Sequence, residues 1–403
     1  MSISKIRFKG YDNSHERKTI GDITTSFSGG TPKSSNKAYY EGNIPFIRSG
    51  EIKSKQTELF ISDEALQNSS AKMVAQGDIL YALYGATSGE VAISQINGAI
   101  NQAILAIKPN LGYSSEFIMN YLKKEKDNIL EKYLQGGQGN LSAAIVKSIE
   151  LHLPSHEEQS AIGSLFRTLD DLLASYKDNI ANYQSLKATM LSKMFPKTGQ
   201  TVPEIRLDGY KGEWEVVQLS DICQKVTEKN KDNNFNETFT NSAEFGIISQ
   251  RDFFEKDISN EKSLNTYYVV RNNDFVYNPR ISNYAPVGPV KRNKLGRTGV
   301  MSPLYFVFRI INSNTDLNFL ETFFNTNTWH KFMKLNGDSG ARADRFAIKD
   351  STFLTMPIAF PSLPEQQAIG AYFSNLDNFI SSNQEKISQL EILKKKLLQD
   401  MFV

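Results

Sequence analysis

Two long segments of the chain carry hydrophobic residues in alternating steps of three and four. The first contains Phe166, Leu169, Leu173, Ile180 and Tyr183, and the second contains Phe373, Leu376, Ile380, Ile387, Leu390 and Leu397. Over several heptads this spacing predicts a coiled-coil seam on two helices, at about 157–195 and 364–402. Lys187 and Lys394 interrupt the two seams at the same place, and we expect Leu186 and Leu393 to take over there.

Each predicted helix begins with the pattern of a capping box. Ser155 stands three residues before Glu158, and Ser362 stands three residues before Glu365. In such a box each side chain bonds the backbone amide of the other residue. Each helix would be roughly 50 Å long at 1.5 Å per residue. One alternative is that each helix belongs to a helical bundle, but two matched seams of this length favour antiparallel pairing with each other as a spacer.

The two helical segments are copies of one sequence. Aligned without a gap, residues 153–195 and 360–402 are identical at 17 of 43 positions. A fainter repeat opens each half of the chain, where Ile6–Tyr11 matches Ile205–Tyr210. The segments in between, roughly 24–150 and 223–357, show little resemblance to each other. The sequence therefore predicts a duplicated frame that carries two diverged inserts.

Both inserts have a mixed α/β pattern. Short β-rich runs bounded by Gly, Asn and Pro occur at 44–47, 78–81, 103–107, 274–277 and 304–308. Helical stretches follow at about 115–134 and 317–335. The predicted fold class is α/β (α+β), with two such domains separated by two long helices in an antiparallel coiled coil and related by a pseudo-twofold repeat. The expected boundaries are 1–153 and 200–358 for the α/β domains, and 154–199 and 359–403 for the helical segments.

The composition excludes several classes of protein. Among 403 residues, 46 Lys and Arg oppose 44 Asp and Glu, so the net charge of +2 gives no bulk sign of nucleic-acid binding. The single cysteine, Cys223, excludes a disulfide framework and a thiolate metal cluster. The four histidines lack zinc-site spacing, and no run of about 18 apolar residues occurs. We expect a cytoplasmic protein with no metal site and no membrane segment.

Candidates for catalysis are weak. Tyr84–Gly89 resembles a phosphate-cradling loop, but no Lys-Ser/Thr pair follows it, and a tight turn is the simpler interpretation. The Asn278-Pro-Arg280 segment lacks the second proline and the aromatic residue of the amino-methyltransferase motif. Nothing in the pattern brings Ser88 and His152 together as a hydrolase pair. We interpret the chain as non-catalytic.

Local clusters of basic and small polar residues in both inserts suit DNA. Lys and Arg bind phosphates, while Arg, Asn, Gln and Ser read base edges. A solvated loop is the alternative for each cluster taken alone, but their occurrence in both inserts favours nucleic acid. The candidate DNA-binding residues are Lys33, Ser34, Arg48, Lys53, Lys55, Thr87, Ser88, Gln138 and Asn140 in the first insert, and Arg280, Tyr284, Lys291, Arg292, Lys294, Arg297, Arg342 and Arg345 in the second.

Together these features resemble the specificity subunits of type I restriction–modification systems. The resemblance rests on the two Glu-Gln-x-Ala-Ile-Gly helix entries at 158–163 and 365–370, and on Gly77-Asp-Ile-Leu80 leading into Gly85-Ala-Thr-Ser-Gly89. It covers essentially the whole chain. The first opening departs from the pattern, because His15 stands where the second copy has Trp214. The Gly85–Gly89 loop has no clear twin, and 278–289 occupies a comparable place.

The resemblance implies a non-catalytic DNA-recognition subunit. In that family two target-recognition domains each read one half of a split site in double-stranded DNA, and an antiparallel coiled coil separates them. Two modification subunits dock on this frame and typically methylate an adenine in each half-site with S-adenosylmethionine. Restriction subunits add cleavage and translocation driven by ATP and magnesium. The chain itself is expected to bind no cofactor and to act in the prokaryotic cytosol.

Two other classes stay open at this point. One is a duplicated enzyme with cryptic sites, which turnover of a nucleotide or ester by the purified chain would support. The other is a coiled-coil adaptor that binds only proteins, which a lack of sequence-selective DNA binding would favour.

Overall fold

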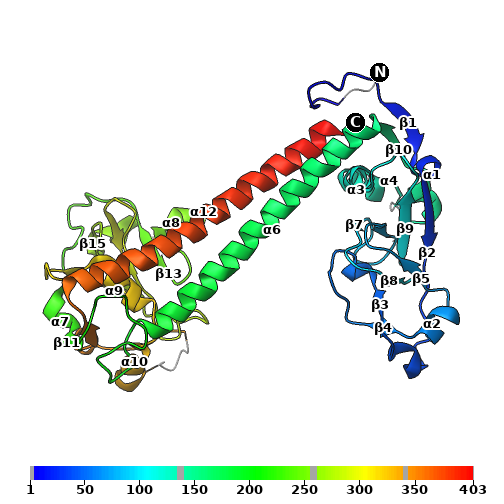
Figure 1. Ribbon diagram of the computed structural model, residues 1–403. Helices are drawn as coiled ribbons and strands as arrows, with labels where there is room; N and C mark the ends of the chain where they lie inside the picture. Colours follow the sequence, from blue (N-terminus) through cyan, green and yellow to red (C-terminus); the bar gives the residue numbers. More distant parts are fainter. Residues whose placement is uncertain (1–3, 134–139, 255–260, 339–343, 403) are drawn as a thin grey trace. The chain divides into compact units, whose positions relative to one another are not determined.

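The computed structural model describes residues 4–133, 140–254, 261–338 and 344–402 (Figure 1). It divides into two compact units. Unit 1 consists of residues 1–177 and 384–403, and unit 2 consists of residues 178–383. Each unit therefore contains one insert and part of both long helices. The four segments expected from the sequence divide the chain in a different way and stay a prediction.

Unit 1 is a mixed α/β domain. Its elements before the long helices are β1 (Glu16–Thr19), α1 (Ile20–Ile23), β2 (Thr24–Ser28), η1 (Lys37–Tyr40), β3 (Ile44–Ile47), η2 (Ser49–Glu51), β4 (Phe60–Ile61), α2 (Asp63–Gln67), β5 (Lys72–Val74), β6 (Ile79–Ala82), β7 (Val91–Ile93), β8 (Gly98–Ile100), β9 (Ile104–Pro109), α3 (Ser115–Lys124), α4 (Lys126–Tyr133), α5 (Ala143–Lys147) and β10 (Glu150–Leu153).

Unit 2 is also mixed α/β. Its elements besides the long helices are β11 (Glu215–Gln218), α7 (Leu219–Ile222), β12 (Cys223–Lys225), β13 (Phe239–Ser242), β14 (Gly246–Ser249), α8 (Gln250–Phe254), η3 (Glu261–Thr266), β15 (Tyr268–Val270), β16 (Phe275–Tyr277), β17 (Val290–Arg292), β18 (Gly299–Met301), β19 (Phe306–Ile310), α9 (Leu317–Phe324), α10 (His330–Asn336), α11 (Asp350–Leu354) and β20 (Pro357–Phe360).

Both units contain the same central sheet. Its four strands follow the order β2-β9-β6-β7 in unit 1 and β12-β19-β16-β17 in unit 2, with every neighbouring pair antiparallel. The register is equivalent, because Ile79 of β6 faces Ile107 of β9 and Phe275 of β16 faces Phe308 of β19. The inserts differ in sequence but share one fold.

A second group of strands repeats as well. β3 pairs with β4 and β5 pairs with β8 in unit 1, just as β13 pairs with β14 and β15 with β18 in unit 2. β3 runs parallel to β8, and Thr238, just before β13, forms a parallel bridge to Val300 of β18. In each copy, the first strand pairs with the strand directly before the long helix: β1 with β10, and β11 with β20. The duplication therefore includes the inserts.

The structure confirms the five predicted strands, as β3, β6, β9, β16 and β19, and the two helical stretches. Each stretch consists of two helices: α3 and α4 in unit 1, and α9 and α10 in unit 2. After α9, the Thr326 hydroxyl donates to the carbonyl of Phe323 at 2.7 Å and contacts the Thr328 hydroxyl at the same distance. Such local side-chain bonds compete with helix continuation.

The two long helices are α6 (His156–Lys193) and α12 (Leu363–Met401), within two residues of their predicted bounds (green and red in Figure 1). Their contacts are Asp170–Lys394 and Lys177–Glu391 in unit 1, and Tyr183–Phe379 and Lys187–Asp377 in unit 2. In each unit the partner's number falls as the number on α6 rises. The two helices therefore pair antiparallel within both units.

Lysines occupy the interrupted positions of the seam, and the expectation that Leu186 and Leu393 take over there is wrong. Those leucines are 37% and 44% exposed. The side chains of Lys187 and Lys394 are only 24% and 12% exposed, and their ammonium groups bond aspartates of the facing helix. A lysine can bury its aliphatic stem while its charged head finds a partner, which explains the arrangement.

The other predicted seam residues are buried to different degrees. Phe166, Leu169, Leu173, Phe373 and Leu376 are buried, whereas Ile180, Tyr183, Ile380, Ile387, Leu390 and Leu397 are half-buried.

A buried arginine–glutamate pair joins the start of each copy to the start of its helix. Arg7 donates to both carboxylate oxygens of Glu158 at 2.9 and 2.5 Å, and Arg206 donates to both of Glu365 at 2.7 Å. The Ser155 hydroxyl accepts from the Glu158 amide at 3.3 Å, as a cap requires. Among the described residues neither carboxylate bonds back to the amide of its serine; both accept from arginines instead, so the reciprocal half of the expected capping boxes is not formed.

The glutamines of the repeated helix entries join the frame to the inserts. Gln159 accepts from the amide of Ser114, the N-cap of α3, at 3.2 Å. Gln366 accepts from the amide of Asp316, the N-cap of α9, at 2.9 Å. Each glutamine also donates to the carbonyl of the proline five residues earlier, at 2.9 Å. The repeated glutamine thus positions each insert against its helix.

Each long helix completes the core of the other copy's domain. Phe402, just after α12, packs in unit 1 with its ring centroid 4.9 Å from Phe117 and 5.7 Å from Phe166. Phe195, just after α6, packs in unit 2 at 5.5 Å from Phe319. Because the core of each domain includes the helix end of the other copy, the two copies fold together.

Candidate DNA interface

In each unit, a loop at the end of a central strand lies beside a segment near the end of the insert. The loop follows β6 in unit 1 and β16 in unit 2. In unit 1 Tyr84, after β6, forms an antiparallel bridge with Asn140, and in unit 2 Arg280, after β16, forms one with Arg345. The neighbouring amides of Leu141 and Phe346 donate to carbonyls of these loops at 2.7 Å in both units. We call these two positions the loop junctions: Tyr84 with Asn140, and Arg280 with Arg345.

The Gly85–Gly89 loop is a tight turn between β6 and β7. Gly85 and Gly89 have positive φ angles of +85° and +80°, which glycine adopts without strain. The Ser88 hydroxyl donates to the carbonyl of Leu83 at 3.1 Å, and His152 lies on β10 opposite Arg17. The turn places the predicted residues Thr87 and Ser88 next to the unit 1 junction, and Ser88 has a backbone partner rather than a histidine.

Lys53 also reaches this edge of unit 1. Its ammonium and that of Lys126 both bond the carboxylate of Glu90, one residue after the turn. The bonds from Lys126 and Lys53 lower the pKa of Glu90 to about 2. The charge of Lys53 is therefore partly balanced inside the protein before any ligand arrives.

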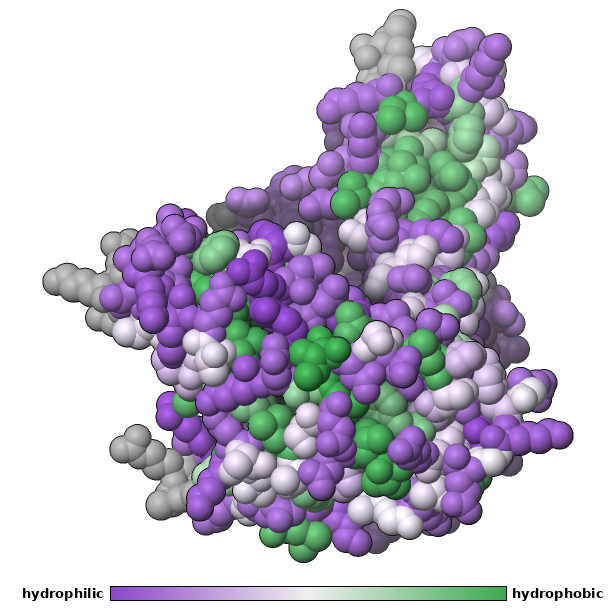
Figure 2. Space-filling model, turned by 90° about the vertical axis from the view of Figure 1, so that its left-hand side faces the viewer, coloured by the Kyte–Doolittle hydropathy of each residue, from purple (hydrophilic) through white to green (hydrophobic). Residues whose placement is uncertain are grey.

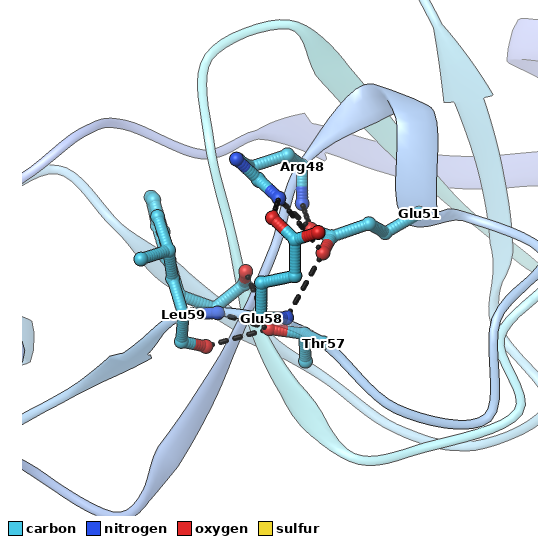
Figure 3. Close-up of polar contacts among 6 residues, drawn as sticks. Arg48, Glu51, Thr57, Glu58 and Leu59 are labelled. Atoms are coloured by element: carbon cyan, nitrogen blue, oxygen red, sulfur yellow. Dashed lines mark hydrogen bonds and ion pairs between the residues drawn. The ribbon is translucent and has the colours of Figure 1, made fainter.

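Arg48 is held by two carboxylates, as Figure 3 shows. Its guanidinium donates to Glu51 at 3.0 Å and to Glu58 at 2.5 Å, and these bonds raise its pKa. Glu51 also accepts from the amide of Glu58, which fixes the loop that carries both acids. These bonds use three of the five N–H donors of the guanidinium, so DNA would have only the donors on Nη1 unless Arg48 exchanged a partner.

The remaining first-insert candidates that the structure describes are exposed. They are Asn140, at the unit 1 loop junction, and Lys33, Ser34 and Lys55. Gln138 and, in the second insert, Arg342 lie outside the described residues. Nothing in the structure tests which of these residues touch DNA, and their roles stay predictions.

The four cations at 291–297 do not form one cluster. Lys291 donates to Asn325 at 3.1 Å, and burial lowers the pKa of its ammonium group. Arg292 and Lys294 pair with Glu321 of α9 at 2.8 and 3.5 Å, and Arg297 pairs with Glu237 at 2.7 Å. These charges already have partners, so the linear sequence overstates how many of them are free for phosphate.

We expect replacement of Lys291, Arg292, Lys294 and Arg297 by alanine to weaken DNA binding and flatten its salt dependence. The slope of log K against log salt should fall by about 0.9 for each phosphate that the variant no longer binds. The measurement is DNA affinity of the assembled complex over a salt series, with circular dichroism to verify folding, because the Arg292 side chain is only 8% exposed. A slope equal to that of wild type would assign these cations to internal pairing alone.

Arg280, Tyr284 and Arg345 line one cavity of about 360 Å³ in unit 2. Tyr284 is 82% exposed, and both arginines are exposed. A larger neighbouring cavity of about 860 Å³ shares Arg345 and Tyr305 with it. The sequence placed these arginines in separate clusters and did not indicate Glu244, which lines the first cavity. No local sequence signal links positions so far apart in the chain.

The described residues contain no group of His, Cys, Asp or Glu that could hold a metal ion. Within the same residues, no helix is long and apolar enough to cross a membrane.

The chain matches the family model of the type I restriction modification DNA specificity domain twice, at residues 14–182 and 211–392. It therefore belongs to the type I restriction–modification DNA specificity family. Over 94% of its length and 90% of the relative's, it is 22% identical to the MjaVIII specificity subunit of Methanocaldococcus jannaschii. Specificity subunits are the non-catalytic DNA-recognition subunits of type I restriction–modification systems, and the resemblance seen in the sequence is confirmed.

Solved structures show the same fold. The S subunit of a type I system from M. genitalium matches 100% of this chain and 99% of its own, with a TM-score of 0.62 at 14% identity. A chain from a type I restriction–modification structure described by its complex assembly and conformational transition matches 97% and 98%, with a TM-score of 0.52 at 15% identity.

Proposed function

We propose that this chain recognises a bipartite, asymmetric site in double-stranded DNA. The insert of unit 1 reads one half-site and the insert of unit 2 reads the other. The observation that carries the proposal is the shared fold of two inserts whose sequences differ. One fold presented twice with different surface residues suits a site with two unlike halves.

The helix pair, in this proposal, sets the unread gap and binds two modification subunits. Repeat-equivalent hydrophobic residues are exposed on it: Leu172 and Phe379 at 41% and 52%, and Leu186 and Leu393 at 37% and 44%. In unit 1, Leu172 and Leu393 lie one or two positions from the Asp170–Lys394 pair. In unit 2, Leu186 and Phe379 lie one or two positions from the Lys187–Asp377 pair. Two similar surfaces on one chain suit two identical partners. Figure 2 shows one face, where hydrophobic residues form groups among hydrophilic ones.

The chemistry of the complex would come from its partners. S-adenosylmethionine binds the modification subunits, and ATP and magnesium bind the restriction subunits that join through them. This chain binds no cofactor in the proposal, and the complex acts on DNA in the prokaryotic cytosol. Its nearly neutral net charge of +2 fits a complex in which partner subunits supply part of the phosphate contact.

Exchange of one insert tests the proposal. Replacing residues 24–150 by the insert of another family member should change one half of the methylated motif and leave the other half and the gap unchanged. The reciprocal exchange of 223–357 is the matched control and should change only the opposite half. The motif is measured by single-molecule sequencing of DNA methylated by the assembled complex.

Two outcomes would contradict the proposal. If either exchange altered both halves in a well-folded complex, the inserts would not read independently. If the wild-type complex bound DNA without sequence preference, the chain would act as a protein adaptor.

A further inference from the structure

Two arginines of unit 2 differ from the other arginines in their partners. Most arginines that the structure describes form an ion pair with a carboxylate, among them Arg7, Arg17, Arg48, Arg167, Arg206, Arg271, Arg292, Arg297 and Arg309. Among the residues that the structure describes, Arg280 and Arg345 form no such pair. Both residues are exposed and therefore available to a ligand.

These two arginines face each other at the unit 2 loop junction. Residues opposite each other in an antiparallel bridge hold their side chains close together, and like charges in such a pair are destabilising. Arg280 and Arg345 are opposed in this way and line the same cavity. A ligand that accepts hydrogen bonds from both groups would relieve the repulsion.

We propose that Arg280 and Arg345 read guanine in the second half-site, a step that rests on the proposed function. Arginine donates two bonds to the O6 and N7 of guanine in the major groove, and a carboxylate accepts from the N4 amino group of its cytosine. Glu244 lines the cavity with both arginines. The cavity therefore presents donors and an acceptor that match the two sides of a G·C pair.

The equivalent junction in unit 1 carries a different pair. Tyr84 is opposed to the exposed Asn140, where unit 2 has Arg280 opposed to Arg345. Asparagine forms two bonds with the N6 and N7 of adenine. One structural position thus carries a guanine reader in one unit and an adenine reader in the other, which gives the two half-sites different bases on a common fold.

The test uses the full chain assembled with its modification subunits. The wild-type methylation motif is determined first, and Arg280→Ala and Arg345→Ala are then compared with it. Each variant should lose preference for guanine at one position of the second half-site, by roughly 5- to 150-fold, the discrimination that a bidentate contact provides. The first half-site should be unchanged. Affinities for oligonucleotides with single base changes provide the second measurement.

Arg271→Ala is the matched control, because this exposed arginine of the same unit is paired with Glu228 at 2.7 Å. Its motif should equal that of wild type. A second half-site without any G·C pair, or unchanged motifs in both junction variants, would overturn the proposal. An equal loss of affinity for all sequences would also overturn it, because that result identifies phosphate contacts. A wild-type complex with no bipartite motif would instead refute the proposed function itself.

Discussion

Replacing Arg7 by alanine should lower the free energy of unfolding of the chain by about 3–5 kcal/mol, the cost of leaving one partner of a buried ion pair alone. The Glu158 side chain is 1% exposed, and Arg7 donates to both of its carboxylate oxygens. Without the guanidinium the buried carboxylate would lose its charged hydrogen-bond partner, and its desolvation would no longer be compensated. Equilibrium denaturation of the full chain measures the loss.

Arg17→Ala is the matched control for this prediction. Arg17 also donates twice to one glutamate, Glu150, but the two side chains are 65% and 52% exposed. An ion pair in water contributes little, so this variant should unfold almost as wild type does. Arg206→Ala should repeat the loss in unit 2, where Glu365 is also buried. Equal stability of Arg7→Ala and Arg17→Ala would show that the buried pair is not a major contributor.

The sequence predicted the parts of the fold that depend on local periodicity and on repetition. The helix bounds of α6 and α12 differ from the predicted ones by at most two residues. The common topology of the inserts could not be seen, because strand pairing joins distant residues and tolerates many side chains. β6 and β16, for example, share a place in the sheet but have the sequences ILYA and FVY. The sequence indicates an interruption of the seam at Lys187, because nothing local shows that its partner Asp377 lies on the other helix.

The candidate site was predicted only in part for the same physical reason. The sequence shows which residues are cationic, but not which carboxylate each cation meets after folding. Arg292 belongs to a basic run, yet Glu321 of α9 neutralises it. Arg280 and Arg345 lie in separate runs, yet a single bridge joins them. Charge that remains free after folding is a property of the tertiary structure.

Lengthening both helices by four residues should widen the unread gap of the DNA site by one or two base pairs. Four residues add about 6 Å to a helix, and stacked base pairs are about 3.4 Å apart. The insertions belong after Lys177 in α6 and after Asn383 in α12, where one unit ends and the other begins. Both residues of the Asp170–Lys394 pair then stay in unit 1 and both residues of the Lys187–Asp377 pair stay in unit 2, so each pair remains aligned. The motif is measured by methylation sequencing.

An insertion in α6 alone is the informative control, because it should shift Lys187 by one helical turn from Asp377 if the α12 pairing is otherwise kept. That variant should lose stability and assemble poorly, whereas the double insertion should methylate a site with a wider gap and the same bases on each side. Comparing the two variants separates the effect of helix length from the effect of the alignment between α6 and α12. If the double-insertion complex methylated DNA with the original gap, the spacing would be set by the partner subunits or by the inserts, and the helix pair would serve only to join the two domains.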